Sequence, residues 1–218
     1  MIERTLWGAV YALAIFWICT GELWSPYLLV LPLTAILWEF HQMDSLKMPI
    51  KLAGFGYTLL AGGATFHLIQ LFGANVSFIL FSTFILIWIS DSMAYIGGRL
   101  LGRTPLAPKL SPKKTWEGAI IGALATWGIG LWILLAFHGP TTQLSEPDSW
   151  PRYAWLLPAI IALTAPIGDL IGSKFKRLAQ VKDSGYFLPG HGGFLDRFDS
   201  FLLSVLVVTL FQSEIFVA

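Results

Sequence analysis

Seven apolar stretches, separated by short polar connections, limit what this chain can fold into. A helix needs roughly 17 to 25 residues to cross a hydrocarbon core about 30 Å thick. The first two stretches are short for a complete crossing, so they could form a tight helical hairpin or tilt. We therefore expect an all-α fold, a polytopic integral membrane helical bundle of about seven transmembrane helices. The stretches cover residues 5–20, 23–38, 49–72, 74–90, 118–138, 153–172 and 201–217.

The composition excludes a soluble protein. Of the 218 residues, 56% are hydrophobic and only 12% are charged, whereas ordinary soluble domains carry about 25% charged residues. The single cysteine, Cys19, excludes an internal disulfide, and four scattered histidines without a cysteine partner make zinc a poor candidate. The expected surroundings are membrane lipids, and no nucleic-acid partner is expected.

The basic residues are distributed unequally over the connections between the apolar stretches. When successive connections are assigned to alternate sides, 13 of the 14 Lys and Arg residues fall on one side, and Arg152 alone falls on the other. Basic residues mark the cytoplasmic side of a membrane protein. This predicts a multi-pass protein of the bacterial inner membrane with a cytoplasmic N-terminus and an active site that faces the cytoplasm.

Two of the cytoplasmic connections, residues 91–117 and 169–199, differ from the rest in length and charge. Together they hold 16 of the 27 charged residues. Orientation requires basic residues near helix ends but no acids, and carboxylates at the membrane edge are usually functional. We therefore expect the chemistry in these two connections. The acids are Asp91, Glu117, Asp169, Asp183, Asp196 and Asp199.

In the second connection, the spacing places charged and hydroxyl groups on one helical face. If the preceding helix continues through Ser173, then Asp169, Ser173 and Lys176 or Arg177 lie along one stripe. This would bring a carboxylate at membrane depth close to groups that bind phosphate.

The same connection ends in a pair of carboxylates, Asp196 and Asp199, which are three residues apart. On a helix such a pair repels unless a cation lies between the two groups. Oxygen ligands of this kind suit Mg²⁺, which takes one or two carboxylates and completes its shell with water and substrate phosphates. The alternative is that these acids form salt bridges to Arg197 and nearby lysines at the helix end.

In the first connection, Ser111 and Pro112 have the pattern of a helix start, with Ser111 as the N-cap and Pro112 in the first turn. Lys113 and Lys114 would then lie at a helix N-terminus, where the dipole disfavours cations unless an anion binds beside them. This predicts a phosphate site. The alternative is a plain lysine anchor at the headgroup level.

These residues resemble the signature of the CDP-diacylglycerol synthase family, also called phosphatidate cytidylyltransferases. That signature is a Ser, a Lys-Arg pair, a Lys-Asp pair and then Pro-x-His-Gly-Gly-x-x-Asp-Arg-x-Asp. It is matched here by Ser173, Lys176-Arg177, Lys182-Asp183, Pro189-Gly190-His191-Gly192-Gly193 and Asp196-Arg197-Phe198-Asp199. The first connection also resembles the family, at Asp91, Ala94-Tyr95, Gly98-Arg99 and 111–118. The resemblance is strong from about residue 88, which suggests one membrane-embedded domain, 1–218, with N-terminal helices (1–87) and a motif-bearing catalytic part (88–218).

The resemblance implies transfer of CMP from CTP to phosphatidic acid, which gives CDP-diacylglycerol and pyrophosphate. Mg²⁺ would assist, and a second cation is compatible with the acids present. The catalytic candidates are Asp169, Ser173, Lys182, Asp196 and Asp199. The metal-binding candidates are Asp169, Asp196, Asp199 and, more weakly, Asp91. The substrate-binding candidates are Ser111, Lys113, Lys114, Lys176, Arg177, Asp183, His191 and Arg197.

Two other functions are consistent with parts of the sequence. A cation-coupled secondary transporter could use Asp91 and Asp169 as ion sites, although transport favours polar groups near the midplane of the membrane. A related cytidylyltransferase could act on another lipid phosphate. Glycines at 54, 56, 62 and 63 could pack helices within the chain or across a homodimer.

Overall fold

The computed structural model describes residues 2–21, 24–136, 155–187 and 192–216. Over these residues the chain is helical, as predicted, with one exception, a short two-stranded hairpin. The N-terminal part contains α1 (Ile2–Thr20), the 3₁₀ helix η1 (Ser25–Leu29), α2 (Val30–Gln42), α3 (Met48–Phe72) and the 3₁₀ helix η2 (Gly73–Asn75). The remainder contains α4 (Val76–Leu101), β1 (Pro105–Ala107), β2 (Ser111–Thr115), α5 (Trp116–Ala136), α6 (Leu156–Leu178), α7 (Leu195–Leu210) and α8 (Gln212–Phe216).

Among the described residues, four helices are long and apolar enough to cross a membrane. They are α3, α4, α6 and the part of α5 from Trp116 to Ile133. A shorter apolar helical segment, Leu6–Thr20, lies within α1. In the described part of the chain, several successive helices are therefore long enough to cross the hydrocarbon core of a bilayer, and the protein is a multi-pass membrane protein.

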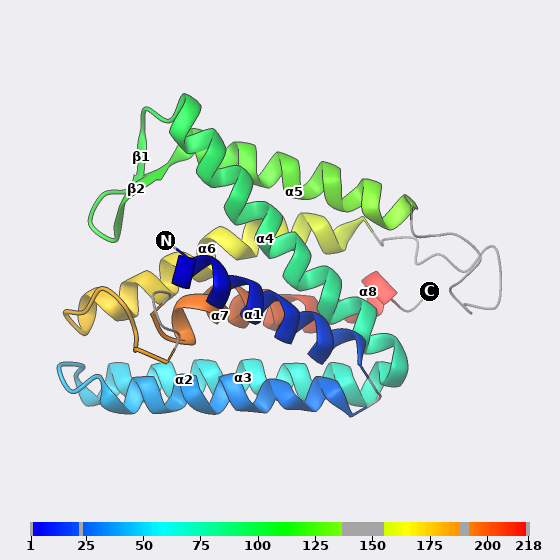
Figure 1. Ribbon diagram of the computed structural model, residues 1–218, viewed down its shortest axis with the longest axis horizontal. Coiled ribbons are helices and arrows are strands. Elements are labelled where there is room, and N and C mark those ends of the chain that lie inside the picture. Colours follow the sequence, from blue (N-terminus) through cyan, green and yellow to red (C-terminus); the bar gives the residue numbers. More distant parts are fainter. Residues whose placement is uncertain (1, 22–23, 137–154, 188–191, 217–218) are drawn as a thin grey trace.

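Successive helices run in alternating directions along the long axis of the molecule (Figure 1). As a result, the turn between α2 and α3, the hairpin and the connection between α6 and α7 lie at the same end. This is the end at which the sequence analysis places the two charged connections. Arg152, the basic residue predicted on the opposite side, lies outside the described residues.

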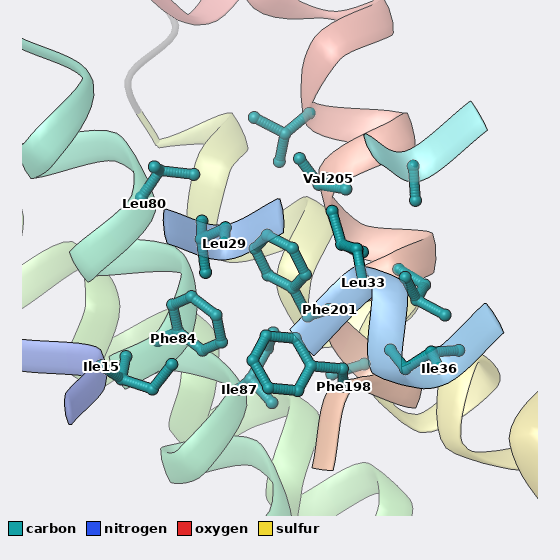
Figure 2. Close-up of a cluster of buried hydrophobic side chains, with 14 of the residues drawn as sticks. Ile15, Leu29, Leu33, Ile36, Leu80, Phe84, Ile87, Phe198, Phe201 and Val205 are labelled. Carbon is teal, nitrogen blue, oxygen red and sulfur yellow. The ribbon is translucent and has the colours of Figure 1, made fainter. Parts of the chain in front are cut away.

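The core packs α7 against α4 and the N-terminal helices (Figure 2). The rings of Phe84 and Phe201 stack with centroids 4.6 Å apart, and Phe198 meets Phe84 edge to face at 5.7 Å. On another face of α7, the Ser200 hydroxyl donates to the Ala165 carbonyl of α6 at 2.9 Å. Aromatic packing on one side and polar contacts on the other thus hold α7 between α4 and α6.

The helices extend further than the apolar pattern predicts. Helix α4 continues past Ser90 to Leu101, so Asp91 lies on a helix and not in a loop, and α6 continues to Leu178. Helix α7 begins at Leu195, before the predicted apolar start at Phe201. Polar residues with adequate helix propensity can continue a helix where their side chains contact a neighbouring helix or water. The expected continuation of the helix through Ser173 is confirmed.

The predicted helix start at Ser111 is wrong. Ser111–Thr115 is strand β2, which pairs antiparallel with Pro105–Ala107, and α5 begins only at Trp116. The Glu117 carboxylate accepts hydrogen bonds from the backbone N–H groups of Arg103 and Thr104 and ties the base of the hairpin to α5. Because each strand of a two-stranded hairpin has an open edge, the missing N–H of Pro112 is tolerated there.

Candidate active site

A cavity of about 500 Å³ lies where α4, the hairpin, α5, α6 and α7 meet. Its lining includes four carboxylates and five basic side chains, an unusual concentration for a chain with 12% charged residues. Ala119 of α5 closes one side. The α6–α7 wall consists of Pro166, Asp169, Lys176, Asp196, Arg197 and Asp199. The α4–hairpin wall consists of Ser90, Asp91, Ala94, Tyr95, Gly98, Arg99, Leu106, Lys113, Lys114 and Thr115.

Two glycines of α6 allow the α6–α7 wall to form. A Cβ atom at Gly168 would lie 2.7 Å from the Asp199 carbonyl oxygen, and a Cβ at Gly172 would lie 2.6 Å from the Asp199 Cβ. Because both positions lack a side chain, α7 approaches α6 closely and Asp199 is buried between the two helices.

Ion pairs connect the acids of the cavity to its lysines. Lys114 of β2 pairs with Asp169 of α6. Lys176 of α6 lies 2.6 Å from the nearer carboxylate oxygen of Asp196 and 4.0 Å from Oδ2 of Asp199. The positive charges of the two lysines therefore compensate the negative charges of carboxylates that would otherwise repel one another in a partly desolvated cavity.

Asp196 is held more completely than the other acids. Its Oδ2 accepts the backbone N–H groups of Ser184 and Gly193, at 2.8 and 2.9 Å, and the Ser184 hydroxyl at 3.0 Å. Gly192 adopts a φ of 81°, and a Cβ at that residue would meet the Asp196 carboxylate. Asp196 thus organises the end of the α6–α7 connection in addition to pairing with Lys176.

The α4–hairpin wall is more open. Asp91, Arg99 and Lys113 are exposed, whereas Lys114 and Thr115 are half-buried. The hairpin is anchored from α6, because Arg177 donates from Nε to the Leu110 carbonyl oxygen at 3.2 Å. Arg177 therefore supports the hairpin from outside the lining.

The structure brings eight of the predicted site residues together in the cavity lining, and five further described ones lie outside it. Ser173 is buried outside the lining, and its hydroxyl donates a long hydrogen bond of 3.5 Å to Oδ1 of Asp169. Ser111 is half-buried on β2, and Lys182 and Asp183 are exposed in the connection after α6. His191 lies outside the described residues. The eight lining residues are Asp91, Lys113, Lys114, Asp169, Lys176, Asp196, Arg197 and Asp199.

Four residues of the lining with polar side chains are not among the predicted site residues: Ser90, Tyr95, Arg99 and Thr115. Asp91, Tyr95 and Arg99 follow one another at intervals of four, so they share a face once α4 continues past Ser90. That periodicity was the available signal. The apolar run ends at Ser90, so hydrophobicity alone does not show that the helix continues through these residues.

The donor chemistry of the cavity is compatible with Mg²⁺. In the described part of the chain, no group of three or more His, Cys, Asp or Glu side chains converges as a preformed metal cage. Mg²⁺ does not need one, because it uses one or two carboxylates with waters and substrate phosphates. Asp199 fits this role best: it lines the cavity, its Oδ1 accepts the Ser200 N–H at 2.8 Å, and its Oδ2 lies 4.0 Å from the Lys176 ammonium group. Asp196 fits it least, since its Oδ2 already accepts three hydrogen bonds and its Oδ1 lies 2.6 Å from Lys176.

Comparison with known proteins identifies the family to which the chain is similar. The chain matches the model of the cytidylyltransferase family over residues 52–214. It is 42% identical over 130 residues to a phosphatidate cytidylyltransferase of Rickettsia conorii, over 59% of this chain and 55% of the relative. It is 36% identical over 181 residues to one of Staphylococcus saprophyticus, over 80% of this chain and 62% of the relative.

The matched regions span little more than half the length of these relatives. The family match itself covers most of the chain and includes α4 to α7, which line the cavity. The resemblance seen in the sequence is therefore confirmed at the level of the family. This chain belongs to the cytidylyltransferase family.

Proposed function

We propose that this chain is a phosphatidate cytidylyltransferase that transfers CMP from CTP to phosphatidic acid. In this reaction a phosphate oxygen of phosphatidic acid bonds to the α-phosphorus of CTP. The bond from that phosphorus to the β-phosphate oxygen breaks, and CDP-diacylglycerol and pyrophosphate result. The observation that carries the proposal is the cavity in which four carboxylates and five basic side chains meet at one end of a membrane-embedded bundle.

The basic residues suit two negatively charged substrates. Phosphoryl and nucleotidyl transfer depend mainly on positioning and on compensation of charge, and they require little covalent chemistry from the protein. Lys113 and Arg99 are exposed on the α4–hairpin wall and would bind phosphates that arrive from water. Lys114 is already paired with Asp169 and would exchange that partner for a phosphate oxygen when substrates bind, whereas Lys176 would bind a phosphate oxygen and remain paired with Asp196.

The acids would hold the divalent ion. Asp199 and Asp169 are the proposed ligands, with Asp91 on the opposite wall as a further candidate. Bound Mg²⁺ would supply charge compensation for the phosphates of CTP and for the leaving pyrophosphate. Asp196 would instead keep Lys176 and the start of α7 in place through the contacts described above. Ser173 would orient the Asp169 carboxylate through the hydrogen bond that its hydroxyl donates to Oδ1.

We also propose that α1, α2 and α7 cross the membrane together with the four long helices, in the bacterial inner membrane. The end that holds the cavity would then face the cytoplasm, where CTP is available, and the acyl chains of the lipid would remain among the helices. The concentration of basic residues at that end supports this orientation. A homodimer remains a prediction. Gly54 packs on Phe40 within the chain, whereas a Cβ at Gly56 or Gly63 would meet nothing within 4 Å.

The transporter alternative finds less support. Coupling-ion sites are expected near the middle of the membrane, between discontinuous helices. Asp91 and Asp169 lie instead in the same cavity as five basic residues, at the end of the bundle where the hairpin lies.

The proposal is tested with purified protein, radiolabelled CTP and a panel of lipid phosphates, in detergent and in liposomes. We expect CDP-diacylglycerol to form from phosphatidic acid, and chelation of Mg²⁺ to stop turnover until the ion is restored. A product from a different lipid phosphate alone would identify a related cytidylyltransferase. No turnover under either condition would refute the proposal.

A further inference from the structure

A buried carboxylate outside the cavity lies beneath the start of α7. Glu39 belongs to α2, in the N-terminal third of the chain, and it is fully buried. Its Oε1 accepts the Phe194 N–H at 2.6 Å, and its Oε2 accepts the Leu195 N–H at 2.9 Å. The first N–H groups of a helix have no partner within the helix, so a carboxylate from another helix satisfies two of them here.

The same carboxylate is connected to the α6–α7 wall through one hydroxyl group. Ser184 Oγ lies 2.7 Å from Oε2 of Glu39 and 3.0 Å from Oδ2 of Asp196. A serine hydroxyl has a single proton to donate, so this group serves one carboxylate or the other at a given moment. Asp196 in turn pairs with Lys176. A chain of direct contacts therefore runs from Glu39 through Ser184 and Asp196 to Lys176.

The surrounding packing leaves Glu39 little freedom. A Cβ at Gly185 would lie 2.8 Å from Oε1 of Glu39, and a Cβ at Gly193 would also meet this carboxylate, so the connection closes tightly over it. The neighbouring residue, Phe40, is fully buried and meets the ring of Phe175 of α6 edge to face at 5.1 Å. Adjacent residues at the end of α2 thus contact both α6 and α7.

We propose that Glu39 is a positioning residue for the active site: it fixes the start of α7 and, through Ser184, the orientation of Asp196 and Lys176. The inference rests on the proposed cytidylyltransferase function, because its consequence is a defined geometry of the α6–α7 wall. Asp199 lies one helical turn after Leu195, so a displaced helix start also displaces Asp199. Small displacements of catalytic groups lower turnover strongly.

The main test compares Glu39→Gln with the wild type. The glutamine has the same shape but only one acceptor oxygen, and its NH2 group would face either the Phe194 N–H or both the Leu195 N–H and the Ser184 hydroxyl. We expect kcat to fall roughly tenfold or more, and the Mg²⁺ concentration for half-maximal rate to rise. Glu39→Asp keeps the charge and should retain more activity than Glu39→Gln. Asp44→Asn is the matched control, since its side chain is 97% exposed beyond the end of α2, and it should behave as the wild type.

A second measurement does not depend on turnover. Hydrogen exchange of the substrate-free protein in detergent should show faster exchange of residues 192–200 in Glu39→Gln, with other helices unchanged. If the wild type proves inactive, the proposed function fails, but this exchange result still decides whether Glu39 holds the start of α7. Wild-type exchange in Glu39→Gln would overturn the inference even in an active enzyme.

Ser184→Ala keeps the inference testable if Glu39→Gln does not fold. It removes the link between Glu39 and Asp196 and leaves the two N–H contacts of Glu39 in place. We expect it to lower kcat and to raise the Mg²⁺ requirement, less strongly than Glu39→Gln. In the double variant the two effects should not multiply, because both changes break the same chain of contacts. A wild-type kcat and Mg²⁺ requirement in Ser184→Ala would overturn the link to Asp196.

Discussion

The two walls of the cavity carry similar side chains but hold them differently. In the α6–α7 wall, the side chains of Lys176, Asp196 and Asp199 are 9 to 12% exposed, whereas Arg197 is exposed. Where the walls meet, the Lys114 and Asp169 side chains are 26 to 28% exposed. On the α4–hairpin wall, Arg99 and Lys113 are exposed. The α6–α7 wall, called the buried wall below because three of its charged side chains are at most 12% exposed, is therefore preorganised. The α4–hairpin wall, called the exposed wall, can adjust to the substrates.

This difference has a physical origin. Close helix packing at glycines removes water from the α6–α7 wall, so its charges must be paired and hydrogen-bonded. A two-stranded hairpin buries little surface, and its charged side chains stay hydrated. We expect substitutions in the buried wall to affect turnover and substitutions in the exposed wall to affect substrate affinity.

The largest effect is expected when a carboxylate of the buried wall loses its charge. Asp199→Asn and Asp169→Asn should each lower kcat by about 100-fold or more, because the proposed ion then loses a charged ligand. Folding should persist, as measured by gel filtration and thermal melting in detergent. Wild-type rates in both variants would remove the metal assignment, and Asp44→Asn serves again as the exposed control.

A methyl group introduced between the helices should have the next largest effect. In Gly172→Ala the new Cβ would lie 2.6 Å from the Asp199 Cβ, so α6 and α7 must separate. Overpacking of this kind costs about 1 to 3 kcal/mol, and the displaced carboxylate should lower kcat roughly 10- to 100-fold.

Gly56→Ala is the matched control for this prediction. It makes the same chemical change on α3, where a Cβ would meet nothing within 4 Å. Melting temperature and kcat are measured for both variants. Equal behaviour of Gly172→Ala and Gly56→Ala would show that the close approach of α6 and α7 is not required.

The smallest effect is expected in the exposed wall. Lys113→Ala should raise KM for CTP about twofold to fivefold and leave kcat nearly unchanged, because an exposed cation contributes about 1 kcal/mol or less to binding. The rise should shrink at high ionic strength, since salt already screens this charge in the wild type. A large loss of kcat with unchanged KM would instead place Lys113 at the reacting phosphates, and the two walls would not differ as described.

Much of the helical arrangement and of the charged region could be predicted from patterns of neighbouring residues in the sequence. Each of the seven predicted apolar stretches overlaps one of the helices α1 to α7 in order, because hydrophobic length is a property of consecutive residues. In the described part of the chain, four of these helices are long and apolar enough to cross a membrane. The spacing of Asp169, Ser173 and Lys176 predicted one helical face, and the contacts from Asp169 to Ser173 confirm it. The charged connections were also recognised as the region that forms the cavity.

Other features could not be read from neighbouring residues. Ser111 and Pro112 fit a helix start as well as a strand, and pairing with Pro105–Ala107 decided between the two. Glu39 is a single acid near the end of an apolar stretch, and its partners lie 145 to 156 residues away in the chain. A local pattern contains no information about such distant partners.

The sequence by itself determined the membrane environment, the order of the helices and the residue types available for metal and phosphate binding. These depend on composition and periodicity, which are local. The tertiary structure decided which acids pair with which lysines, that Asp196 organises the connection while Asp199 faces the cavity, and that α2 supports the start of α7. Those outcomes depend on how closely helices distant in sequence approach one another, and glycine contacts and buried hydrogen bonds set that distance only in the folded protein.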